Sequence, residues 1–149
     1  MPDKTVSTTV VKAPQETVMG VIADIRAYPQ WAGGVKAAEV AEAGEDGLPL
    51  RVRLVVDAGF LKDRVDLLYD WHSDTQVSWE LTGPSSLLSS LTGGYVLAPH
   101  QGGTEVTYEL TMSLRVPIIG ILRRRAERMI TDGALNGLKS QAEKLGGAT

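Results

Sequence analysis

The sequence has 149 residues, 43% hydrophobic and 22% charged, as is ordinary for a globular protein with a sizeable core. Its formal net charge of −3 argues against nucleic acid as the main partner, because no domain-wide basic field would release counterions. The absence of cysteine excludes disulfides, thiol catalysis and thiolate metal sites. Residues 1–12 lack an apolar signal segment, and no apolar run approaches the length of a membrane span. We therefore expect one domain over residues 1–149 and a cytoplasmic location.

The first part of the chain predicts a strand followed by a short helix. Residues 5–12 are rich in threonine and valine, which favours a strand. Pro14-Gln15-Glu16 opens a helix, and Tyr28-Pro29 is expected to end it, because the residue before proline avoids the helical region. A short turn or helix through residues 30–32 then leads to Gly33-Gly34.

The middle of the chain predicts consecutive strands joined by turn residues. Short turns between successive strands imply an antiparallel sheet. Alternation gives the sheet one covered, apolar face, with Val65, Tyr69 and Trp79 among its residues, and one charged face that includes Arg53 and Asp66. The predicted strands cover residues 35–43, 50–58, 61–71, 76–81, 89–98 and 104–114.

The last long segment, residues 117–145, predicts a helix that covers the apolar face of this sheet. Pro117 is a natural helix start, because proline at the first helical position gives up an N–H that would be unpaired anyway. Gly146-Gly147 is a natural stop. Successive residues lie about 100° apart, which gathers the apolar and small residues on one half of the helix. That half contains Ile118, Ile119, Leu122, Ala126, Met129, Ile130, Gly133, Ala134, Gly137, Leu138 and Leu145.

Gly133 and Gly137 lie in the middle of the buried half, where a core helix normally has its bulkiest side chains. Each internal glycine costs a helix about 1 kcal/mol relative to alanine, so their presence requires a steric reason. Two explanations are open. Either the helix backbone presses closely onto large side chains of the sheet, or the small residues leave a hollow that a ligand fills.

Four segments carry a resemblance to a known superfamily. They are Ala13-Pro14-x-Glu16, Ala23-Asp24-Ile25 to Tyr28-Pro29-x-Trp31, Gly93-Gly94-Tyr95-x-Leu97, and Gly103-Thr104-Glu105-Val106-Thr107-Tyr108-Glu109-Leu110. With the order of elements, they resemble the START-related SRPBCC superfamily of polyketide cyclase/dehydrase and lipid-transport proteins, which includes coenzyme Q-binding proteins. The resemblance implies an α+β helix-grip fold. A curved antiparallel sheet of six to seven strands would wrap around the C-terminal helix, with two short helices after the first strand.

The same resemblance implies a hydrophobic tunnel between sheet and helix, and it favours the hollow as the reason for the two glycines. The expected function is binding or transport of a hydrophobic small molecule, such as a lipid, an isoprenoid or a polyketide-like compound, with no cofactor. A buried tyrosine hydroxyl needs a partner, and in a tunnel a ligand carbonyl is a candidate. The expected lining is Tyr69, Trp71, Trp79, Tyr95, Tyr108, Leu110, Met112, Leu122, Ala126, Met129, Ile130, Gly133 and Gly137.

A second interpretation is a polyketide aromatase/cyclase or dehydratase. In such members of the superfamily an interior arginine and tyrosine, with water, are thought to fold and dehydrate a poly-keto chain. Here Arg51, Arg53 and Arg64 have the outward parity, and no strand is expected to supply an inward arginine, histidine or carboxylate to move protons. His72 and His100 fall in predicted turns, and no metal motif is found. The sequence therefore favours a non-catalytic carrier.

Arg123, Arg124, Arg125 and Arg128 form the one basic cluster of the chain. It is either a solvated helix face or a docking patch for anionic lipid beside the tunnel, since apolar residues flanked by arginines suit a membrane surface. A third interpretation is an interaction protein that uses this face or the outer face of the sheet. We expect a monomer or a weak homodimer.

Overall fold

The computed structural model describes residues 4–59, 61–83, 85–115 and 120–147. The helical elements are α1 (Gln15–Ala23), η1 (Ile25–Ala27), α2 (Tyr28–Trp31), α3 (Gly120–Ala142) and the π-helical η2 (Glu143–Gly147). The strands are β1 (Thr5–Val11), β2 (Val35–Ala43), β3 (Pro49–Ala58), β4 (Leu61–Ser73), β5 (Gln76–Thr82), β6 (Leu88–His100) and β7 (Gly103–Leu114).

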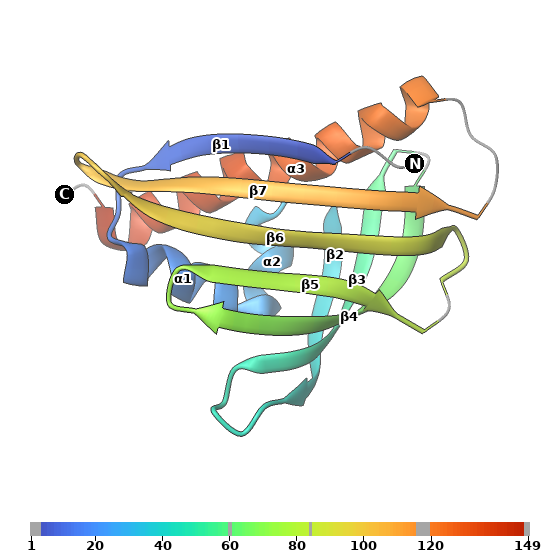
Figure 1. The fold of residues 1–149 in the computed structure, drawn as a ribbon, viewed down its shortest axis with the longest axis horizontal. Helices are drawn as coiled ribbons and strands as arrows, with labels where there is room; N and C mark the ends of the chain where they lie inside the picture. The colour runs from blue at the N-terminus through green and yellow to red at the C-terminus, as the bar shows by residue number, and fades with distance from the viewer. Residues whose placement is uncertain (1–3, 60, 84, 116–119, 148–149) are drawn as a thin grey trace.

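All seven strands form one antiparallel sheet in the order β1-β7-β6-β5-β4-β3-β2. Figure 1 shows β1, β7 and β6 passing in front of α3, with α1 and α2 on the same side of the sheet as α3. The predicted α+β helix-grip architecture is therefore confirmed. Each predicted strand lies within about two residues of the observed one, because alternation and turn residues mark both ends.

The register of the sheet places the predicted apolar face toward the helices. Tyr69 pairs directly with Trp79 across β4 and β5, and Tyr95 pairs directly with Tyr108 across β6 and β7. All four side chains are buried. Directly opposite residues share a face of the sheet, so this pairing assembles the aromatic side chains into one cluster.

The segment before β2 differs from its prediction. Tyr28-Pro29 does not end the first helix, because Asp24 has already left helical geometry at ψ 74°. Tyr28 instead begins α2 with helical angles of −51° and −42°, and Pro29 occupies the first turn, where its missing N–H costs nothing. The short helix predicted through residues 30–32 is thus α2, shifted by two residues toward the N-terminus.

Helix α3 packs most extensively on β1 and also contacts β7, α1 and α2. Its predicted start at Pro117, together with Ile118 and Ile119, lies outside the described residues. The buried side includes Ala126 and Leu138 as expected, together with Glu127, which is only 2% exposed. Leu145, expected on the buried side, is 63% exposed, because the turn changes to π-helical geometry after Ala142 and the 100° spacing no longer applies.

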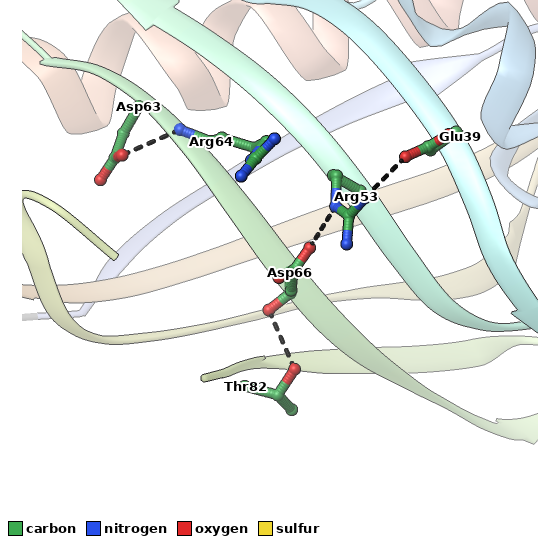
Figure 2. A network of polar contacts seen from close by, with 6 residues as sticks. All are labelled: Glu39, Arg53, Asp63, Arg64, Asp66 and Thr82. Atoms are coloured by element: carbon green, nitrogen blue, oxygen red, sulfur yellow. Dashed lines mark hydrogen bonds and ion pairs between the residues drawn. The ribbon is translucent and has the colours of Figure 1, made fainter. Parts of the chain in front are cut away.

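The outer face of the sheet carries a ladder of charged side chains. Arg53 on β3 bonds Asp66 on β4 (Nε to Oδ1, 2.8 Å) and Glu39 on β2 (Nη1 to Oε1, 3.1 Å), as Figure 2 shows. The hydroxyl of Thr82 on β5 extends the network by donating to the backbone oxygen of Asp66 at 3.3 Å. Since exposed pairs contribute at most about 1 kcal/mol each, this ladder marks the outer face more than it stabilises the fold.

Candidate functional site

An apolar cavity lies between the inner face of the sheet and α3. About 80 Å³ of it is accessible to the centre of a water molecule. A single water needs roughly 10–15 Å³ on that measure, so the cavity has room for several waters or for part of a small organic molecule. Its walls come from β3 to β7, from residues 31–35 at the end of α2, and from Ile130 and Ala134 of α3.

One wall of the cavity is an aromatic cluster. The ring centroid of Trp79 lies 5.3 Å from that of Tyr69, 5.5 Å from Tyr95 and 5.8 Å from Tyr108, and the two last rings lie 5.0 Å apart edge to face. Gly93 makes this arrangement possible, because a Cβ at that position would lie 2.6 Å from Nε1 of Trp79. Gly93, the first residue of the Gly93-Gly94-Tyr95 motif, therefore leaves the space that the indole ring of Trp79 occupies.

The tyrosine hydroxyls are the main polar groups of this wall. Tyr28 donates to the backbone oxygen of Ile22. The hydroxyl of Tyr69 lies close enough to that of Tyr28 to interact with it. Within the described part of the chain, the hydroxyls of Tyr95 and Tyr108 have no hydrogen-bond partner. Burial raises the pKa of all four tyrosines, so each is a neutral donor at neutral pH.

Trp31 adds a further donor to the lining. Its Nε1 atom is buried and has no hydrogen-bond partner among the described residues, and its ring packs against Tyr28 at 4.9 Å. A buried unpaired N–H carries a desolvation cost that a bound acceptor atom would relieve. Sequence reasoning missed Trp31 as a lining residue because it lies in a four-residue helix, where no periodicity predicts the direction of a side chain.

Asp63 is the one lining residue charged at neutral pH among those described. Burial alone raises the pKa of a carboxyl, but hydrogen bonds from the Ser85 hydroxyl and from backbone N–H groups, including those of Leu87 (3.0 Å) and Arg64 (2.9 Å), lower it overall. The expectation that no strand supplies an inward carboxylate was therefore wrong. Asp63 has the same parity as the inward Val65, so the alternation already contained this signal.

The predicted lining residues divide into two groups. Tyr69, Trp79, Tyr95, Tyr108, Leu110 and Ile130 line the cavity. Trp71 lies farther along β4, where its Nε1 donates to the backbone oxygen of Pro49 at 2.7 Å, and Met129 is 47% exposed. Met112 and Ala126 are buried in the core outside the cavity, and Leu122, Gly133 and Gly137 also lie outside its lining.

The two helix glycines have a reason other than the hollow. A Cβ on Gly137 would lie 1.7 Å from the backbone oxygen of Trp31, and a Cβ on Gly133 would lie 2.8 Å from that of Gly33. The backbone of α3 thus touches the backbone of residues 31–33. Of the two explanations for the glycines, close packing is therefore the correct one. The group that α3 packs against is the backbone at the end of α2, however, and not the large side chains of the sheet.

The remaining candidates lie away from the cavity. Arg124, Arg125 and Arg128 are exposed on α3, whereas Arg123 is partly buried and directs its Nε atom inward. His72 and His100 were expected in turns, but they lie near the ends of β4 and β6. The side chain of His72 is 41% exposed and bonds Ser78 Oγ at 2.7 Å. Among the described residues, no group of three or more His, Asp or Glu side chains is placed to hold a metal ion. None of the described helices has the length and apolarity needed to cross a bilayer.

A family model described as "Polyketide cyclase / dehydrase and lipid transport" matches residues 3–143. The chain belongs to this family. The predicted superfamily is thereby confirmed, and family members bind hydrophobic small molecules. No curated protein matches the sequence.

Solved structures of the same fold cover almost the whole chain. A START superfamily protein from Mycobacterium smegmatis superposes with a TM-score of 0.86 at 20% identity, over 95% of this chain and 98% of its own. The Zhui aromatase/cyclase from Streptomyces sp. R1128 has a TM-score of 0.81 at 17% identity, over 97% and 95%. A protein from Thermus thermophilus has a TM-score of 0.79 at 23% identity, over 95% and 98%. At these identities the likeness establishes the fold, and function has to be argued from the cavity.

Proposed function

We propose that this protein binds or carries a hydrophobic small molecule, such as a lipid, an isoprenoid or a polyketide-like compound, in the cavity beside α3. The observation that supports this most directly is the buried indole N–H of Trp31, which belongs to the lining of an apolar cavity and has no hydrogen-bond partner among the described residues. Tyr95 and Tyr108 add two hydroxyl groups to the same lining. Buried polar groups are nearly always paired, so this exception indicates where a ligand acceptor binds.

The cavity supplies affinity and orientation through different groups. Apolar side chains such as Leu54, Leu67 and Leu91 contribute through burial of ligand surface, at about 25 cal/mol per Å². The hydroxyls of Tyr95 and Tyr108 fix the direction of a carbonyl group by donating to it. Because both hydroxyls keep their protons at neutral pH, this donation is constant across the physiological range.

Native mass spectrometry of the protein purified from its own host tests the proposal. We expect an additional mass of a few hundred daltons that is lost on denaturation. The variant Tyr95→Phe/Tyr108→Phe keeps the cavity shape but removes both donors, and we expect it to carry less of this molecule. Tyr69→Phe is the matched control, since the Tyr69 hydroxyl already bonds Tyr28. A protein that binds no hydrophobic compound from its host, or from a panel of ketones and esters, would contradict the proposal.

Catalysis as a polyketide aromatase/cyclase or dehydratase is the alternative that Asp63 favours. An ionised carboxylate at the cavity wall is a group able to accept a proton, and the neutral tyrosines are able to polarise a carbonyl. Turnover of a poly-keto substrate would support this alternative if Asp63→Asn lowered kcat more than it changed binding. Unchanged substrate after long incubation with saturating protein would argue for a carrier.

We also propose that the exposed part of α3 contacts anionic membranes. Ile121 is 62% exposed and lies on one helix face with Arg124, Arg125 and Arg128, because these positions are three, four and seven residues apart. Apolar and basic side chains on one face suit an anionic lipid surface. Arg123, although part of the predicted cluster, points away from this face. We expect sedimentation with phosphatidylserine vesicles but not with phosphatidylcholine vesicles, and no sedimentation of an Arg124→Gln/Arg125→Gln/Arg128→Gln variant.

A further inference from the structure

The polar groups of the cavity are distributed unevenly by charge and by type. The aromatic wall offers neutral donors, the hydroxyls of Tyr95 and Tyr108 and the indole N–H of Trp31. Asp63, near the start of β4, offers acceptor atoms and a negative charge. No described lining residue is a lysine, arginine or histidine. The described wall of the cavity therefore has a negative charge and no positive charge to balance it.

The carboxylate of Asp63 is held in place by neutral groups only. Oδ2 accepts from the Ser85 hydroxyl and from the N–H of Leu87 at 3.0 Å, while Oδ1 accepts from the N–H of Arg64 at 2.9 Å. Figure 2 shows the bond to the Arg64 backbone, with the Arg64 side chain extending away from the carboxylate. Ser85 is itself 6% exposed and accepts from the N–H of Leu88 at 3.2 Å, so the arrangement is fixed.

Two arginines lie near Asp63 without neutralising it. The guanidinium of Arg115 donates to the backbone oxygen of Ser85 at 2.8 Å, and among the described residues neither Arg115 nor Arg64 forms an ion pair with Asp63. Hydrogen bonds from neutral donors stabilise a carboxylate but leave its net charge in place. Because no cation lies in the described wall of the cavity, that negative charge is available to act on a bound ligand.

We propose that Asp63 makes the cavity selective against anionic ligands, so that neutral carbonyl compounds such as esters and ketones bind and fatty acids do not. This inference rests on the proposed binding function. A neutral carbonyl group satisfies the donors of Tyr95 and Tyr108 without cost. A carboxylate would satisfy the same donors, but it would lose its hydration in a cavity whose described walls offer no cation and already carry one negative charge.

A matched pair of ligands tests the selectivity. cis-Parinaric acid and its methyl ester have the same fluorescent chain and differ only in the charge of the carboxyl group. We expect the methyl ester to bind the wild-type protein at least 10-fold more tightly at pH 7.5, a difference of about 1.4 kcal/mol. Equal affinity for the two probes would overturn the inference and leave the binding function standing. Binding of neither probe, nor of other neutral esters and ketones, would overturn the binding function as well.

The variant Asp63→Asn assigns the selectivity to one residue. Asparagine keeps an oxygen that accepts from Ser85 and Leu87 but removes the charge, so we expect the acid to gain about 10-fold in affinity while the ester changes less than 3-fold. Asp66→Asn is the control, because Asp66 lies on the same strand but on the outer face, bonded to Arg53. The ratio of the affinities for the ester and the acid is the quantity to compare. If Asp63→Asn left this ratio unchanged, or if Asp66→Asn changed it equally, the assignment to Asp63 would be overturned. The wild-type ratio decides the selectivity itself even if a variant fails to fold.

Discussion

Two regions under α3, bordered by neighbouring residues of the same helix, are built in opposite ways. At Gly133 and Gly137 the helix backbone touches the backbone of residues 31–33, and no side chain fits between them. At Ile130 and Ala134 the same helix borders the cavity. Gly133 and Gly137 thus serve the close contact and not the hollow. By fixing α3 against the end of α2, they hold the helix where the curved sheet leaves space beside it.

The largest expected effect comes from adding one methyl group to the close contact. In Gly137→Ala, the new Cβ would lie 1.7 Å from the backbone oxygen of Trp31, and backbone is unable to move aside as a flexible side chain would. We expect a loss of about 3 kcal/mol or more in the free energy of unfolding, against the roughly 1 kcal/mol that alanine normally gains in a helix. Urea denaturation of the variant measures the loss.

The control for this variant is Asn136→Ala, on the exposed side of the same helix turn. Its free energy of unfolding should stay within about 0.5 kcal/mol of the wild type or rise slightly, because only helix propensity changes. If Gly137→Ala were as stable as Asn136→Ala, the close contact beneath α3 would be wrong, and the hollow would again be the better explanation for the glycines.

Alkaline pH acts on the cavity wall and leaves the glycine contact untouched. The chain has four tyrosines, and all four are buried around the cavity with a raised pKa caused by burial. Their stabilising contribution is complete below pH 10, the ordinary pKa of tyrosine, and is lost as the pH rises toward their folded values. Each contributes a slope of up to about 1.4 kcal/mol per pH unit in that window.

Absorbance at 295 nm, which reports tyrosinate, should therefore rise together with unfolding and not before it. No exposed tyrosine exists to contribute an early signal, since all four are among the described, buried residues. Titration of even one tyrosine near pH 10 in the folded protein would show that the cavity wall is open to water.

Single hydroxyl deletions separate paired from unpaired groups within this wall. Tyr69→Phe removes a hydrogen bond to Tyr28 and should cost about 1 kcal/mol of unfolding free energy. Tyr108→Phe removes a hydroxyl without a described partner and should be neutral within about 0.5 kcal/mol, or slightly stabilising. Thermal and urea unfolding of the two variants give the comparison, and a Tyr108→Phe variant that is less stable than Tyr69→Phe would show that the hydroxyl of Tyr108 is paired in the protein.

The sheet was predictable from the sequence because its rule is local. Side chains alternate with a period of two, so the positions of Tyr69, Trp79, Tyr95 and Tyr108 along their strands place them on one face. The same rule also places Asp63 inward. A carboxylate is rare on an apolar face, and the groups that make its burial possible, Ser85 and the N–H of Leu87, lie on a separate segment that alternation along β4 does not describe.

The segment that contacts Gly133 and Gly137 was not predictable from the sequence, because it lies far from these glycines in the chain. Helical spacing placed Gly133 and Gly137 correctly on the inner side of α3 but carried no information about what faces them. That partner, residues 31–33, is an irregular segment without periodicity. Met129 was misassigned for a related reason: it lies at the margin of the helix face, where a small error in rotation exchanges buried for exposed, and it is 47% exposed.

A small change in stability is expected from filling the cavity with side-chain atoms. Ala134→Leu adds three carbon atoms at a position that is 7% exposed and borders the space beside α3. Leucine and alanine are both good helix formers, and the added atoms occupy a void where they bury apolar surface. We therefore expect the free energy of unfolding to change by less than about 1 kcal/mol, although three carbons are added here and a single carbon at Gly137 is expected to be severely destabilising.

Binding of the neutral parinaric ester should fall by at least about 10-fold in Ala134→Leu, since the ligand and the new side chain would compete for the same space. Asn136→Leu, which adds a similar volume on the exposed side of α3, should leave binding unchanged. A stable Ala134→Leu protein that binds the ester as tightly as the wild type would place the ligand elsewhere. If Ala134→Leu were as unstable as Gly137→Ala, α3 would be packed closely along its whole inner side. A leucine fits at position 134 only if open space lies beside it.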